Sequence, residues 1–83
     1  MSIKILTISY KILHMEEIFR QRLLEEIKNS KLTNIELAKK VGVSPEMITQ
    51  YYTTKKLPKL DTFTRLCEAL NVSADYLLGL KDF

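Results

Sequence analysis

Apolar residues recur at helical spacing through most of this 83-residue chain, and this periodicity is the strongest constraint on its fold. One stripe, in the segment 15–29, consists of Ile18, Phe19, Leu23 and Ile27. Another, in the segment 60–70, consists of Leu60, Phe63, Leu66, Cys67 and Leu70. Only two glycines and two prolines interrupt the chain. The pattern predicts an all-α fold, and the length allows one small domain.

Two further helices have clear starts. Thr33 followed by Glu36 forms a capping-box pattern, and the buried side of that helix is expected to hold Ile35, Leu37, Ala38 and Val41. After Gly42, Ser44 is a good N-cap, and a proline at the first helical position is harmless because its missing N–H has no partner there. Asn29 or Ser30 is expected to close the first helix and Asn71 the fourth, and "VSADYLLGL" predicts a short fifth helix.

Charge is unevenly distributed along the chain, whose formal net charge is +3. Residues 33–60 contain five lysines against two acids, whereas residues 61–83 contain four acids against two basic residues. This asymmetry favours a polyanion on one face of the domain. An ordinary solvated lysine surface explains the charge equally well.

Catalytic, metal and membrane signatures are not found in the sequence. The single cysteine, Cys67, lies in an apolar stripe and is interpreted as a small buried hydrophobe, and His14 is interpreted as a linker residue. Because no nucleophile–base pair, paired carboxylates or metal-spaced ligands occur, we expect no enzyme and no cofactor. The N-terminal apolar run is too short to span a membrane and has no cleavage site, so we expect a cytoplasmic protein. We also expect no small-molecule substrate, since the sequence shows none of the signatures of such a site.

Two short helices joined across "VGVS", with lysines after the second, form a helix-turn-helix candidate. Gly42 supplies the turn, and Ile48 and Tyr51 give the second helix an apolar docking face. Its opposite face holds the hydrogen-bonding residues Glu46, Thr49, Gln50 and Thr53. Such a face is what readout of base edges in the major groove requires.

The ordered set "ELAKKVGVS", "LCEALNVS" and "DYLLGL" resembles the lambda-repressor-like (xenobiotic-response-element type, Cro-like) helix-turn-helix regulators. The resemblance runs through residues 32–80. It implies a five-helix bundle that works as a homodimer on a two-fold, double-stranded DNA operator. Residues 15–83 would then be the DNA-binding domain.

The resemblance also implies site residues. The positions that face the major groove are Ser44, Pro45, Glu46, Thr49 and Gln50. The positions that meet the DNA backbone are Asn34, Thr53, Lys55 and Lys56, and Tyr52 is a further candidate for the backbone. Gln50 is the expected reader, since an amide bonds bidentately to adenine. Pro45 departs from the polar reader frequent in this family, and Thr54 replaces the glycine that often ends this helix.

The function that follows is sequence-specific binding of duplex DNA by a small prokaryotic or phage transcriptional regulator, most simply a repressor. The alternative is a protein-interaction module on the same fold, such as an antitoxin-like or anti-repressor subunit. Pro45, Glu46 and Tyr52 favour the alternative, and the lysine excess and polar face oppose it.

The segment "MSIKILTISYKILH" fits no part of the family pattern. Its Ile, Thr and Tyr residues favour a β-strand, and a lone strand needs a partner. We therefore expect residues 1–14 to be an N-terminal extension that pairs with its copy in a second subunit. The alternative is that Met15 is the natural start of the protein.

Overall fold

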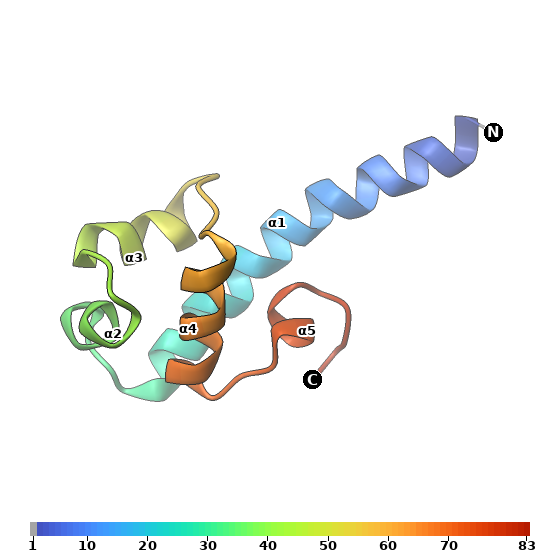
Figure 1. The fold of residues 1–83 in the computed structure, drawn as a ribbon. Coiled ribbons are helices and arrows are strands. Elements are labelled where there is room, and N and C mark those ends of the chain that lie inside the picture. Colours follow the sequence, from blue (N-terminus) through green and yellow to red (C-terminus); the bar gives the residue numbers. More distant parts are fainter. Residues whose placement is uncertain (1) are drawn as a thin grey trace.

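The computed structural model describes the backbone of residues 2–83 and the side chains of residues 14–83. This part of the chain forms five helices and no strand (Figure 1). They are α1 (Ser2–Ser30), α2 (Asn34–Val41), α3 (Pro45–Thr53), α4 (Leu60–Leu70) and α5 (Ala74–Leu77). The all-α, five-helix fold predicted from the sequence is confirmed.

The strand expected for the N-terminal extension is wrong for residues 2–14, which are the first half of α1. No glycine or proline lies between Ser2 and Ser30, so nothing interrupts a helix that continues from the segment 15–30. Strand propensity depends on a neighbouring strand, and residues 2–83 contain none. His14 therefore lies within a helix and is not a linker residue. The first half of α1 projects beyond the other helices in Figure 1.

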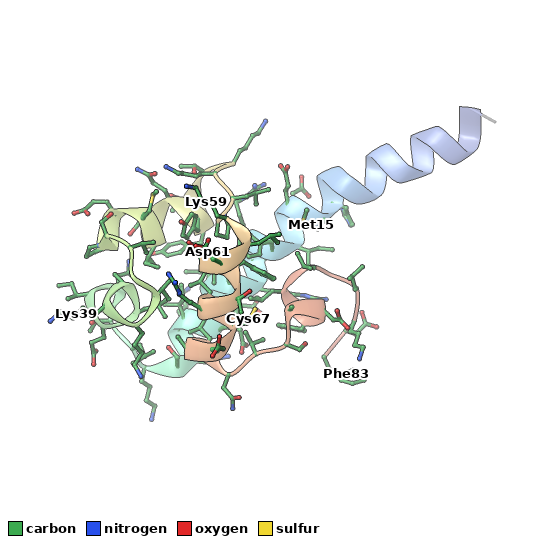
Figure 2. The ribbon with its side chains drawn as sticks, in the orientation of Figure 1. Met15, Lys39, Lys59, Asp61, Cys67 and Phe83 are labelled. Carbon is green, nitrogen blue, oxygen red and sulfur yellow. The ribbon has the colours of Figure 1, made fainter. Side chains whose placement is uncertain are left out.

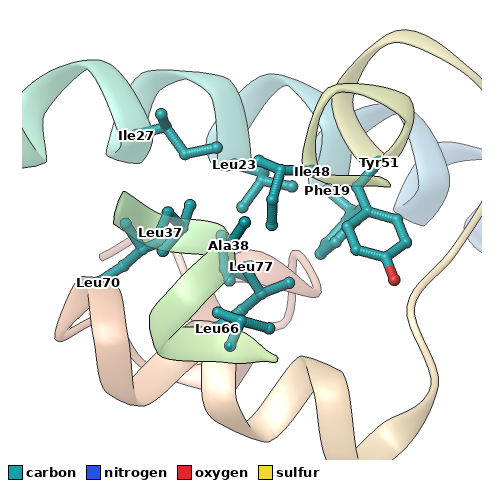
Figure 3. Close-up of a cluster of buried hydrophobic side chains, with 11 residues drawn as sticks. Phe19, Leu23, Ile27, Leu37, Ala38, Ile48, Tyr51, Leu66, Leu70 and Leu77 are labelled. Atoms are coloured by element: carbon teal, nitrogen blue, oxygen red, sulfur yellow. The ribbon is translucent and has the colours of Figure 1, made fainter. Parts of the chain in front are cut away.

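The core lies where α1 meets the four shorter helices (Figure 3). Its buried hydrophobic residues are Phe19, Leu23, Ile27, Leu37, Ala38, Val41, Ile48, Tyr51, Leu66, Leu70 and Leu77. Phe19 and Phe63 also meet as a tilted ring pair with centroids 6.0 Å apart. Burial, with the nearby Asp61 as a smaller cause, raises the pKa of Tyr51. One core therefore joins all five helices.

Two residues assigned to apolar stripes are exposed instead. Ile35 is 59% exposed and Leu60 is 84% exposed. Each lies in the first turn of its helix, and neither belongs to the buried core. Cys67 is partly buried against the core, and this burial raises the pKa of its thiol. None of the described helices is long and apolar enough to cross a membrane.

The helix ends follow local chemistry with one exception. Asn71 closes α4 in the left-handed conformation, with φ of 54°, as predicted. At the end of α1 the left-handed residue is Lys31, with φ of 63°, and not Asn29 or Ser30. Ser30 instead donates its hydroxyl hydrogen to the carbonyl of Ile27 at 2.7 Å. The backbone thus turns one residue later than expected before it enters α2.

Arg22 of α1 holds the C-terminal segment against the bundle. Its Nη1 donates to the carbonyl oxygens of Tyr76, at 2.5 Å, and Lys81, at 2.6 Å. The guanidinium carbon also lies 4.3 Å from the centroid of the Tyr76 ring, in a cation–π contact. The end of the chain is thereby attached to the helix that begins it.

Candidate nucleic-acid interface

The start of α2 is fixed by a complete capping box. The Thr33 hydroxyl accepts the backbone N–H of Glu36, and the Glu36 carboxylate accepts the backbone N–H of Thr33, both at 3.1 Å. These bonds, the one from the Thr33 backbone first, hold the pKa of Glu36 below its ordinary value. The capping box predicted from "LTNIE" is confirmed.

The turn between α2 and α3 depends on Gly42, which ends α2 with φ of +85°. Residues other than glycine rarely adopt this backbone conformation. The N–H groups of Gly42 and Val43 both donate to the carbonyl of Ala38, at 2.8 and 3.1 Å. This tight turn brings α3 across α2, as Figure 1 shows.

The start of α3 follows the predicted chemistry. The Ser44 hydroxyl accepts the backbone N–H of Met47 at 3.2 Å, and Pro45 occupies the first helical turn. Glu46 lies in the same turn, where the helix dipole favours a negative side chain. Pro45 and Glu46 therefore begin the helix and do not disrupt it.

The two sides of α3 differ in burial and polarity, as is required of a helix that reads base edges in a DNA groove. Ile48 and Tyr51 are buried in the core, so they fix the helix on the bundle. The residues whose side chains are exposed are Glu46, Gln50 and Thr53, and Thr49 is partly exposed. A polar strip therefore runs the length of α3 on the side turned away from the core.

Asn34, at the first position of α2, is bonded to α3. Its Nδ2 donates to the Thr49 hydroxyl at 2.9 Å and to the Tyr52 hydroxyl at 3.0 Å. The Thr49 hydroxyl in turn donates to the carbonyl of Pro45 at 3.3 Å. A side-chain amide has two N–H groups, so both hydrogens of Asn34 are used within the protein. The phosphate contact expected for this amide from the sequence therefore has to compete with bonds inside the domain.

The exit of α3 uses a threonine in place of a glycine. Thr54 has an extended backbone, with φ of −126°, so no left-handed residue is needed there. Its hydroxyl donates to the carbonyl of Gln50 at 2.6 Å and accepts the N–H of Lys56 at 3.1 Å. The lysine segment therefore leaves α3 in a defined direction.

Three lysines follow α3 in the loop to α4. Lys55, Lys56 and Lys59 are exposed, and Figure 2 labels Lys59 just ahead of α4. Within the described side chains, Lys81 pairs with Asp75 and His14 lies 3.9 Å from Glu17, so no ion pair neutralises these lysines. Positive charge is thus available beside the polar strip of α3.

The structure brings the predicted residues together in one region. Ser44, Pro45, Glu46, Thr49 and Gln50 lie on one α3 segment, and Thr53, Lys55 and Lys56 follow at its end. Asn34 and Tyr52 join the region through their mutual hydrogen bond. Sequence reasoning missed that bond because its partners are 18 residues apart, and only the packing of α2 on α3 brings them together.

Comparison with known proteins identifies the arrangement. A family model described as helix-turn-helix (HTH_3) matches residues 23–77, more than half of the chain. The chain belongs to the lambda-repressor-like helix-turn-helix family. The matched range covers α2, the Gly42 turn, α3 and α4 in full. Residues 1–22, which include the projecting half of α1, lie outside it.

A curated relative extends this finding. The chain is 40% identical over 62 residues to a Bacillus subtilis (strain 168) protein named "Uncharacterized HTH-type transcriptional regulator YobD". The match covers 75% of this chain and 55% of that protein. The chain thus spans about half the length of this helix-turn-helix relative. No solved structure matches the chain significantly.

Proposed function

We propose that this helix-turn-helix protein binds duplex DNA sequence-specifically and regulates transcription, with α3 in the major groove. The observation that carries the proposal is the two-sided character of α3. Buried Ile48 and Tyr51 hold the helix rigidly, and its exposed polar strip ends at exposed lysines. The donors and acceptors of the polar strip suit hydrogen bonding to base edges. The positive charge beside them suits attraction to DNA phosphates.

The hydrogen bonds within the protein narrow the candidates for base contact. Gln50 is exposed, so its amide is available for bidentate bonding to adenine. The Thr49 hydroxyl already bonds Asn34 and Pro45, which leaves its methyl group to contact a thymine methyl. Glu46 at the helix tip is an acceptor for cytosine N4, and Ser44 and Pro45 flank it in the same groove. Gln50 is the side chain on which specificity should depend most.

The hydroxyl hydrogens that remain available support the proposed phosphate contacts. The Tyr52 hydroxyl accepts a bond from Asn34, so its own hydrogen is available to a phosphate oxygen. The Thr53 hydroxyl donates to the carbonyl of Thr49 at 2.7 Å, so it must rotate before it reaches a phosphate. Lys55 and Lys56 carry the electrostatic attraction. Asn34 then acts by positioning Thr49 and Tyr52, while the backbone N–H groups at the start of α2 face the phosphate.

We propose a cytoplasmic homodimer that occupies a two-fold operator as a repressor. One recognition helix per subunit predicts half-sites about 34 Å apart, which is one turn of DNA. The relative's printed name, an HTH-type transcriptional regulator, supports regulation of transcription. Repression is the simplest mode, because occupancy of an operator is sufficient to obstruct transcription.

The experiment that tests specificity is selection of bound sites from a random duplex pool, with Gln50→Ala and Gln21→Ala as variants. Gln21 is an exposed glutamine on α1, outside the polar strip of α3, so it is a matched control. The wild type and Gln21→Ala should enrich a two-fold symmetric sequence. Gln50→Ala should lose discrimination at one base pair of each half-site, by about 1–3 kcal/mol. A bound pool that stays random for the wild type would contradict sequence-specific binding.

The second candidate, a protein-interaction module, is favoured by one observation. Ile35 and Leu60 are large apolar residues left exposed on α2 and α4. Their exposure fits a protein partner better than it fits a phosphate backbone. Failure of the wild type to bind any duplex DNA at low salt would favour this candidate.

A further inference from the structure

An apolar groove lies beside the point where the projecting half of α1 leaves the bundle. It is lined chiefly by Met15, Phe19, Leu57, Leu60, Phe63 and Leu78, and its volume is about 120 Å³. An engineered cavity of about 150 Å³ accommodates benzene, so this α1–α4 groove has room for about one large side chain. Leu60 and Leu57, on its rim, are 84% and 41% exposed. These two leucines leave apolar surface exposed beside the groove.

The heptad spacing of Met15 and Phe19, two residues that line this groove, extends in the sequence into the projecting half of α1. Ile5, Ile8, Ile12, Met15 and Phe19 follow one another at spacings of three, four, three and four residues. This is the heptad spacing by which two helices pack along a common seam. Met15 and Phe19 line the α1–α4 groove, so the seam positions lead directly into it. Ile5, Ile8 and Ile12 thus share the heptad register of two residues that line the groove.

The projecting half of α1 cannot reach the groove of its own chain. α1 is one uninterrupted helix from Ser2 to Ser30, so residues 2–14 extend away from the bundle in the direction that the helix axis sets (Figure 1). The molecule is accordingly elongated, 47 Å in its longest dimension and 23 by 20 Å in the others. Residues 2–14 can therefore cover this groove only in another copy of the chain.

We propose that two copies of this chain dimerise by antiparallel pairing of their α1 helices, each projecting half covering the α1–α4 groove of its partner. The 13 residues from 2 to 14 extend roughly 20 Å at 1.5 Å per residue, which is close to the two shorter dimensions of the molecule, 23 and 20 Å. The interface is isologous, because each chain supplies one seam and one groove. This interface rests on the homodimer of the proposed function. Its test contains no DNA, so failure of the interface can be distinguished from failure of DNA binding.

The test is sedimentation equilibrium of the full chain over a wide concentration range, without DNA. The wild type should dimerise, and Ile8→Glu and Leu60→Glu should each raise the dimer dissociation constant roughly tenfold or more. Leu60 is exposed, so Leu60→Glu should keep the circular dichroism spectrum of the wild type. Ile35→Glu is the matched control, since it places the same charge on an exposed apolar residue of α2 outside the groove.

Isotope-filtered NMR of a mixture of labelled and unlabelled chains tests the geometry. Nuclear Overhauser contacts should join the methyl groups of Leu57 and Leu60 in one copy to residues 2–14 of the other. A wild type that stays monomeric at every concentration overturns the proposal, whatever else the groove binds. A dimer that Leu60→Glu leaves intact, or that lacks these contacts, overturns it equally.

Discussion

At the scale of single residues, Asn34 links the two helices of the helix-turn-helix. Its amide reaches Thr49 and Tyr52, which lie one turn apart on α3. Gln50 lies between them in the sequence, so these bonds hold the α3 turn that carries Gln50 against α2. Asn34, expected from the sequence to touch DNA, is thus also a link that holds α2 to α3.

Replacing Asn34 by alanine should lower the free energy of unfolding by about 1–2 kcal/mol, since two partly buried hydrogen bonds are lost. The measurement is urea unfolding followed by circular dichroism. Asn29→Ala is the control, because Asn29 is exposed near the end of α1 and alanine favours helix there. Equal free energies of unfolding for Asn34→Ala and the wild type would show that the two Asn34 hydrogen bonds do not contribute to stability.

Local chemistry could be predicted from the sequence, whereas contacts between distant residues could not. The Thr33–Glu36 capping box and the Ser44 cap involve partners three residues apart, so the sequence determines them. The Asn34 bonds join residues 15 and 18 apart, and they exist only after α2 and α3 have packed. Residue spacing also predicts which residues share a helix face. It does not predict how much of that face the other helices cover, and Leu60 is therefore exposed although it shares the apolar stripe of α4.

At the scale of elements, α2 is short and depends on its ends. It has eight residues, fewer than an isolated helix needs to be stable in water. The capping box at Thr33 and the left-handed Gly42 satisfy backbone groups that the helix leaves without partners. α2 should therefore respond to changes at its caps.

The capping box makes part of the stability dependent on pH. Because bonds from Thr33 lower the pKa of Glu36, the folded state is favoured while this carboxylate is ionised. The contribution is present above the ordinary pKa of 4.5 and is lost as the pH falls through the lowered value. Melting temperatures should thus fall less between neutral and acid pH in Glu36→Gln than in the wild type.

Glu25→Gln is the control for this comparison, because Glu25 is an exposed glutamate in the middle of α1. It should retain the acid-induced fall of the wild type. If Glu36→Gln also retained that fall in full, the capping box would not be the source of the pH dependence.

The strand expected at the N-terminus shows a limit of element prediction. Residues 1–14 are rich in Ile, Thr and Tyr, which favour strands when a neighbouring strand is present. Residues 2–14 instead continue α1, with no glycine or proline to separate the two segments. The dimerisation role assigned to this extension stays a prediction, and its form changes from a paired strand to a paired helix.

At the scale of the whole molecule, the polar strip of α3 and a group of exposed lysines lie together. α3 presents Gln50, and the following loop presents Lys55, Lys56 and Lys59 without ion-pair partners among the described side chains. The acidic C-terminal segment is held against α1 by Arg22, through bonds to Tyr76 and Lys81. The charge asymmetry visible in the sequence thus becomes a basic region in the fold.

The most direct test of DNA binding through this region is a fluorescence anisotropy titration of duplex DNA at a series of salt concentrations. The wild type should bind at low salt. The logarithm of its affinity should then fall linearly with the logarithm of the salt concentration. The double variant Lys55→Ala/Lys56→Ala should reduce that slope by about two, one for each lost phosphate contact. Lys28→Ala/Lys81→Ala removes the same charge from the last turn of α1 and from the C-terminal segment, and it should keep the wild-type slope. Absence of wild-type binding at the lowest salt, or equal slopes for both double variants, would contradict this interface.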